Sequence, residues 1–172
     1  MTLLLLGLLA AVNPAVELRA ILEVTQTPSV GLLAVHNGQM SFEGRGTVKP
    51  NSLVSVGSIS KVLAAEVFSQ LVVEGKLQFG DPLQKFAPAG VKVPEGITLF
   101  GLAMHTSGVP RNLSGSDLWP NLKTIDASKA QYSNAGYWFL GAALKPYLPQ
   151  LRDRVTNPLG MKDTTGQPNE EQ

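Results

Sequence analysis

Two short groups of polar residues carry the side chains that could do chemistry in this chain. The first is Ser58 followed by Lys61, in the stretch GSISK. Positions three apart lie on one face of a helix, so the hydroxyl and the ammonium would be neighbours. A serine at a helix N-terminus also lies at the positive end of the helix dipole, which favours negative charge on its oxygen. The spacing allows a serine nucleophile with a lysine beside it, or an N-cap followed by a surface lysine.

The second group is Tyr132-Ser133-Asn134, just before a predicted helix. A tyrosine beside a lysine ammonium can lose its proton near neutral pH, because the opposite charge favours the phenolate. Such a tyrosine could take the proton of Ser58 as a general base and later return it to a leaving group. Asn134 has both a donor and an acceptor, which suits the amide of a substrate. The alternative for Asn134 is the N-cap of the helix that follows.

The elements that must position these groups are one helix, two strands and then mostly helices. The two strand-like runs are joined by Asn37-Gly38, a strong hairpin signal because both residues tolerate positive φ. In chain order, the pattern predicts a helix over 15–25, strands over 29–36 and 39–44, a largely buried helix over 58–75, a short helix over 98–105 capped by Thr98, and helices over 134–147 and 148–159. This order predicts an α+β fold.

The composition narrows the classes of function. The chain has 172 residues, of which 44% are hydrophobic and 16% charged, which is typical of a globular protein. Its net charge of +1 and its lack of a long basic run give no support for nucleic-acid binding. The absence of cysteine excludes disulfides, thiol catalysis and cysteine-based metal sites. No cofactor is implied, although a metal held by histidine and carboxylates is left open.

The remaining single residues have structural interpretations. His36 is predicted to lie at the surface beside the hairpin turn, and His105 to form a hydrogen bond within a turn. Trp119, Trp138 and Tyr137 are predicted to belong to the core or to the wall of a cleft.

The N-terminal segment bears on location. Residues 1–12 form an apolar run that is too short to span a bilayer and resembles the core of a secretory signal, without the usual basic residues before it. A buried N-terminal helix is the alternative. We therefore expect a signal-like segment over 1–15, a domain over 16–172, and a periplasmic or secreted protein that is not integral to the membrane.

Taken together and in this order, the motifs resemble those of the class C β-lactamase and D,D-peptidase family of penicillin-recognising serine hydrolases, particularly the AmpH-type enzymes. The matching stretches are 57–61, 71–83, 81–88, 104–110, 132–137 and 158–163. The resemblance implies a β-lactamase/transpeptidase-like fold, with a helical region and an antiparallel sheet. It also implies Ser58 as nucleophile, Lys61 as its activating partner, Tyr132 as general base and acid, and Asn134 as a substrate contact.

The reaction implied by the resemblance is attack on a β-lactam amide or a D-Ala-D-Ala peptide bond of a peptidoglycan stem peptide. An acyl-enzyme would form, and water would then resolve it. Two alternatives stay open: a catalytically weak penicillin-binding or interaction module, and an esterase acting on small esters.

The family's third element, a Lys/His-Thr/Ser-Gly strand that also supplies an oxyanion donor, is not found after Tyr132. Residues 162–166 (KDTTG) are only superficially similar to it. We therefore expect a chain truncated before that strand, with a truncated antiparallel sheet. Losing one oxyanion donor costs about 3–4 kcal/mol of transition-state stabilisation. Exposed sheet edges would favour a homo-oligomer.

Overall fold

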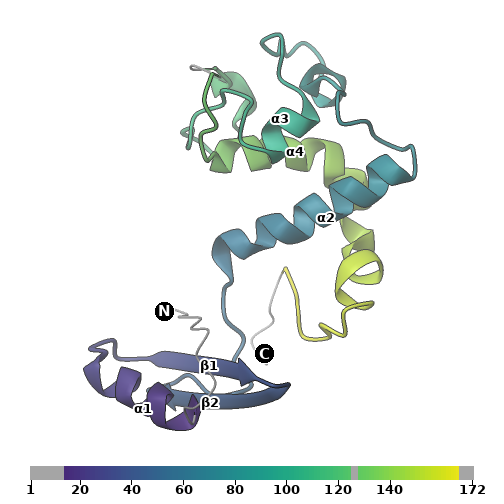
Figure 1. Ribbon diagram of the computed structural model, residues 1–172. Helices are drawn as coiled ribbons and strands as arrows, with labels where there is room; N and C mark the ends of the chain where they lie inside the picture. The colour runs from purple at the N-terminus through teal and green to yellow at the C-terminus, as the bar shows by residue number, and fades with distance from the viewer. Residues whose placement is uncertain (1–13, 125–127, 167–172) are drawn as a thin grey trace. The chain divides into compact units, whose positions relative to one another are not determined.

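The computed structural model describes residues 14–124 and 128–166, which divide into two compact units (Figure 1). The first unit consists of residues 14–55 with 165–166, and the second of Val56–Thr164. Most of the predicted signal-like segment, residues 1–13, lies outside the described residues. Within the described ranges, no helix is long and apolar enough to cross a membrane.

The first unit contains one helix and one hairpin. Helix α1 (Pro14–Val24) packs against strands β1 (Val30–His36) and β2 (Gln39–Arg45), which pair antiparallel. The turn between the strands consists of Asn37 and Gly38, with φ angles of 50° and 77°. These positive values explain the residue types, because asparagine and glycine tolerate this region best. The predicted helix and hairpin are confirmed.

A small core and several polar contacts hold the first unit together. Leu18 of α1 is buried together with Val30 and Leu32 of β1. Arg19 forms an ion pair with Glu43 of β2 at 2.8 Å. In the described part of the chain, the sheet has only these two strands. Each strand thus has one edge without a partner strand in the described sheet. We predict that two copies associate through these edges, and size-exclusion chromatography can test whether the chain is a monomer.

The second unit is helical and carries both polar groups singled out from the sequence. Its helices are α2 (Ser60–Val73), α3 (Leu99–Ala103) and α4 (Asn134–Leu144). Shorter helical turns, labelled η, lie at η1 (Gly57–Ile59), η2 (Leu83–Phe86), η3 (Trp119–Asn121), η4 (Lys145–Gln150) and η5 (Arg152–Thr156). Helix α4 contacts both α2 and α3, so it links the two segments that lead into the candidate site.

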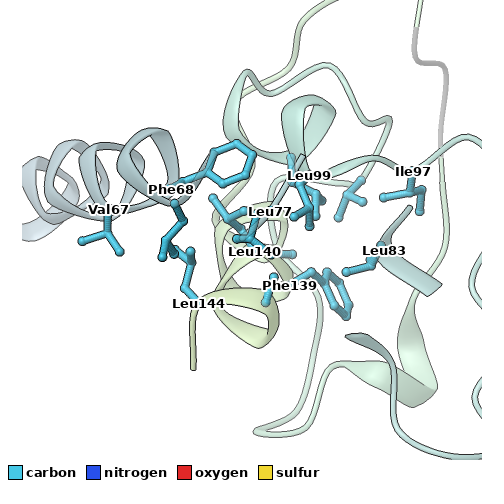
Figure 2. Packing of buried hydrophobic residues seen from close by; sticks show 14 of the residues in the cluster. Val67, Phe68, Leu77, Leu83, Ile97, Leu99, Phe139, Leu140 and Leu144 are labelled. Atoms are coloured by element: carbon cyan, nitrogen blue, oxygen red, sulfur yellow. The ribbon is translucent and has the colours of Figure 1, made fainter. Parts of the chain in front are cut away.

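The core of the second unit lies where these three helices meet (Figure 2). Its side chains include Phe68 of α2, Leu99 of α3, and Phe139 and Leu140 of α4, each at most 2% exposed. Full burial of one such side chain stabilises a fold by about 1.5–3 kcal/mol. The core therefore holds the three helices in a fixed arrangement, which positions the residues at their ends.

Two predictions about helices differ from the structure. Helix α2 is not largely buried, because only Val67, Phe68 and Leu71 are buried while Val62 and Val73 are 66% and 89% exposed. Its apolar composition predicted burial, but only one stripe of the helix contacts α4 and η5.

The second difference concerns the C-terminal helices, which were predicted over 134–147 and 148–159. Helix α4 ends at Leu144, and η4 and η5 follow as a 3₁₀ turn and a π turn. Pro146 and Pro149 explain this ending, because proline has no backbone N–H to donate within an α-helix.

Candidate active site

The start of α2 places the serine and the lysine of the first group. Gly57 has φ of 53°, a value that favours glycine, and this lets the chain turn directly into η1 and α2. Ser60 Oγ donates to the carbonyl oxygen of Gly57 at 2.7 Å and closes this first turn. Ser58 is exposed at the beginning of the helical segment, and Lys61 lies one turn further on.

The structure brings the three predicted catalytic residues together around one oxygen. Lys61 Nζ donates to Ser58 Oγ at 3.1 Å. Tyr132 Oη donates to the same oxygen at 2.5 Å, although the two residues are 74 positions apart in the sequence. Lys61 Nζ also lies 5.0 Å from the centre of the Tyr132 ring. An exposed hydroxyl in contact with a cation and a phenol is an arrangement that can support nucleophilic attack.

The surroundings of Tyr132 favour its ionised form. Its pKa is lowered, first by the hydrogen bond with Lys61, then by the one with Ser58, and further by the charges of Lys61 and Arg111. The Arg111 guanidinium carbon lies 5.1 Å from the centre of the tyrosine ring. A phenol beside two cations can therefore give up its proton more easily and act as a base. Sequence reasoning missed Arg111.

The His105 ring lies against the Tyr132 ring. Its Nδ1 accepts a hydrogen bond from the backbone N–H of Ser133 at 3.0 Å, and its ring lies against Tyr132 and Tyr137 at 4.6 and 5.3 Å. Burial, and then the charge of Lys61, lower the His105 pKa, which favours the neutral ring that an accepting Nδ1 requires. The prediction of a structural hydrogen bond is confirmed. The contact with Tyr132 was not predicted.

Ser133, not Asn134, caps helix α4. Ser133 is buried, its Oγ accepts from the Gly136 N–H at 2.7 Å, and it donates to the carbonyl oxygen of Pro110 at 2.6 Å. The capping alternative for Asn134 is therefore wrong. The Asn134 side chain is exposed and donates to Asn112 Oδ1 at 3.0 Å, two positions after Tyr132 in the chain. Asn112 is another residue that sequence reasoning missed.

His36, Trp119 and Trp138 take part in none of these contacts, whereas the centre of the Tyr137 ring lies 5.6 Å from Lys61 Nζ. His36 is exposed at the hairpin, and Trp119 and Trp138 pack edge to face at 6.0 Å. In the ranges 14–124 and 128–166, no group of three or more histidine and acidic residues could hold a metal ion.

Comparisons with known proteins identify the family and the fold of this chain. Residues 17–172 match the family described as Beta-lactamase. The chain is 33% identical to the D-alanyl-D-alanine-carboxypeptidase/endopeptidase AmpH of Escherichia coli (strain K12), over 83% of this chain and 46% of that protein. The chain thus spans about half the length of the curated relatives it matches.

Two solved structures are also similar. The structure of a beta-lactamase/D-alanine carboxypeptidase from Yersinia pestis, in complex with citrate, matches with a TM-score of 0.68 and 34% identity, over 84% of this chain and 52% of that one. A class C beta lactamase matches with a TM-score of 0.67 and 24% identity, over 84% of this chain and 47% of that one, which shows the fold alone. The predicted fold class is confirmed.

Proposed function

The chain belongs to the beta-lactamase family, and on this premise we propose that it is a serine hydrolase with Ser58 as its nucleophile. The observation that carries the proposal is the convergence of Lys61 Nζ and Tyr132 Oη on Ser58 Oγ, at 3.1 and 2.5 Å. Hydroxyl nucleophiles are weak at their ordinary pKa and need an adjacent base. Both partners of Ser58 belong to the same compact unit as the serine.

The first step is acylation. Once Tyr132 has lost its proton, its 2.5 Å contact with Ser58 reverses and the serine hydroxyl donates to the phenolate. The Lys61 ammonium stabilises that phenolate by charge. Ser58 Oγ attacks the carbonyl carbon of the substrate amide while its proton moves to Tyr132. The C–N bond then breaks, the nitrogen takes the proton from Tyr132, and an ester to Ser58 remains.

The second step is deacylation by water. A water molecule attacks the ester carbonyl and gives its proton to Tyr132, and Ser58 Oγ leaves and takes that proton back. The N–H of Ser58, at the start of the helical segment, is a suitable donor for the oxygen that becomes negative in both steps. Asn134 contacts the substrate beside the reacting bond through its exposed amide.

The substrates we propose are β-lactams and peptides that end in D-Ala-D-Ala. The names of two relatives support this choice, since they are a D-alanyl-D-alanine-carboxypeptidase/endopeptidase and a beta-lactamase/D-alanine carboxypeptidase. The predicted signal-like segment supports action outside the cytoplasm, in the periplasm or after secretion. The proposed chemistry uses side chains and water, and requires no cofactor.

The experiment is an intact-mass time course of the full chain with benzylpenicillin, beside a measurement of D-Ala release from diacetyl-L-Lys-D-Ala-D-Ala. The wild type should gain the mass of one intact penicillin molecule, because the opened lactam stays attached as the ester, and Ser58→Ala should not gain it. Decay of the adduct within minutes identifies a hydrolase, whereas an adduct that persists for hours identifies a penicillin-binding module. Drug consumption that survives Ser58→Ala would overturn the serine mechanism.

A further inference from the structure

A surface hollow of about 580 Å³ lies next to the candidate active site in the second unit. Apolar surface from Pro110, Leu113 and Pro120 forms part of its lining. Asn112 and Lys123 contribute polar groups. The mechanism proposed above does not use this hollow.

The hollow is joined to the site through two of its lining residues. Asn112 Oδ1 accepts the hydrogen bond from Asn134, at 3.0 Å. The carbonyl oxygen of Pro110 accepts from Ser133 Oγ, at 2.6 Å. Asn134 and Ser133 directly follow Tyr132 in the chain. A substrate that lies against Asn134 can therefore continue into the hollow.

The walls are anchored to the core and to one another. Asn121 Nδ2 donates to the carbonyl oxygen of Ser114 at 2.9 Å, which ties the two sides of the loop together. Leu118 and Trp119, between those sides, are buried in the hydrophobic core. The backbone N–H of Trp119 donates to Asp117 Oδ1 at 3.1 Å, so the Asp117 carboxylate near the hollow has a hydrogen-bond partner. The hollow is thus formed by a folded loop.

The positive charge in the lining indicates that the hollow would bind an anionic group. Among the described residues that line the hollow, Lys123 is the one charged side chain. Within the described part of the chain, its ammonium takes part in none of the ion pairs. An apolar wall with an amide and an ammonium suits a group with a short hydrocarbon stem and a carboxylate at its end.

We propose that this hollow is a subsite for a carboxylate-bearing extension on the acyl side of the substrate, bound by Lys123. The proposal rests on the proposed function and names a substrate class for it. The acyl side follows from chemistry, because a D-Ala-D-Ala substrate ends at its leaving residue and can extend only in the other direction. Peptides with an acidic side branch, and β-lactams with an acidic side chain, belong to this class.

The test measures binding and does not depend on turnover. The full chain with Ser58→Ala is titrated by NMR with two peptides, Nα-acetyl-Nε-succinyl-L-Lys-D-Ala-D-Ala and diacetyl-L-Lys-D-Ala-D-Ala, which differ in one terminal carboxylate. We expect the succinylated peptide to bind about fivefold more tightly, the upper range for an exposed ion pair. The preference should fall at high salt, and the largest shifts should occur at Asn112, Asn121 and Lys123.

A matched pair of variants tests whether Lys123 causes the preference for the succinylated peptide. Adding Lys123→Met should remove the preference, whereas Lys92→Met should retain it, because exposed Lys92 lines a different hollow. Equal binding of both peptides, binding of neither, or a preference that survives Lys123→Met would overturn the subsite. The penicillin adduct on Ser58 is a separate readout. An adduct without the charge preference refutes the subsite alone, and the preference without an adduct refutes the proposed function alone.

Discussion

Replacing Ser133 by alanine tests how the segment that carries Tyr132 and Asn134 is held. The Ser133 side chain is 1% exposed and makes two hydrogen bonds. It accepts from the Gly136 N–H as the N-cap of α4, and it donates to the Pro110 carbonyl oxygen. Alanine keeps the Cβ atom and removes both bonds. The substitution therefore changes hydrogen bonding and leaves the shape of the core nearly intact.

The expected loss follows from these two bonds. Loss of an N-cap hydroxyl costs about 1 kcal/mol. An acceptor left without its donor in a partly buried place adds about 1–2 kcal/mol. We therefore expect Ser133→Ala to lower the free energy of unfolding by about 2–3 kcal/mol. With a urea dependence of about 2 kcal/mol per M, the midpoint of urea unfolding should fall by about 1–1.5 M.

Thr98→Ala is the matched control. Thr98 caps α3 with a single side-chain hydrogen bond, from the Gly101 N–H at 3.1 Å. Its loss should cost about 1 kcal/mol and shift the urea midpoint by about 0.5 M. The reasoning is refuted if Ser133→Ala shifts the midpoint no further than Thr98→Ala, since the bond to Pro110 would then contribute nothing.

Three further changes have expected outcomes. Tyr132→Phe should slow acylation by about 10²–10⁴ in a stopped-flow assay, and adding Lys61→Met should cost less than the product of the two single losses. If the loss in the double variant equals the product of the two single losses, Tyr132 and Lys61 act independently, which would contradict the proposed mechanism. The Glu74 pKa is lowered from 4.5 to about 2, and the hydrogen bonds from Arg154 are the largest cause. The stability that this ion pair adds to the folded state is therefore present above pH 4.5 and is lost as the pH falls towards 2. The difference in urea midpoint between wild type and Arg154→Gln should shrink over that window; a constant difference would contradict this. Burial lowers the His105 pKa from 6.5, so wild type, unlike His105→Gln, should lose stability as the pH falls below 6.5. If the stabilities of wild type and His105→Gln change in parallel with pH, the lowered His105 pKa does not contribute to stability.

Local patterns predicted the elements that depend on neighbouring residues. Asn37-Gly38 specified the hairpin turn, and Thr98 specified the start of α3. The three-residue spacing of Ser58 and Lys61 placed these two side chains together. Each of these features depends on chain geometry within one or two turns, so the sequence alone was sufficient.

Contacts between distant segments could not be derived in this way. The approach of Tyr132 to Ser58 spans 74 positions, and it was expected only through the family resemblance. The contacts of His105 and Arg111 with Tyr132 depend on how the loop after α3 folds back. The signal that could have found His105 is its place before Thr-Ser-Gly, within one of the family motifs.

Burial was the weakest inference. Helix α2 is apolar on most sides, yet Val62 and Val73 are exposed, because hydrophobicity says nothing about which surface will be covered. The identity of the N-cap of α4 was also uncertain from sequence, since Ser133 and Asn134 are adjacent and both residue types are good caps. Only the backbone geometry decides that Ser133 takes this place.

The central claim is that Ser58 is the acylated residue, and the site of acylation tests it most directly. The full chain is incubated with benzylpenicillin, quenched in acid, digested and sequenced by tandem mass spectrometry. Ser60 is the internal control, because it lies two positions away and its hydroxyl donates to Gly57. The account predicts the drug on Ser58, no label in Ser58→Ala, and full labelling in Ser60→Ala. A label on Ser60, or one that persists in Ser58→Ala, would contradict it.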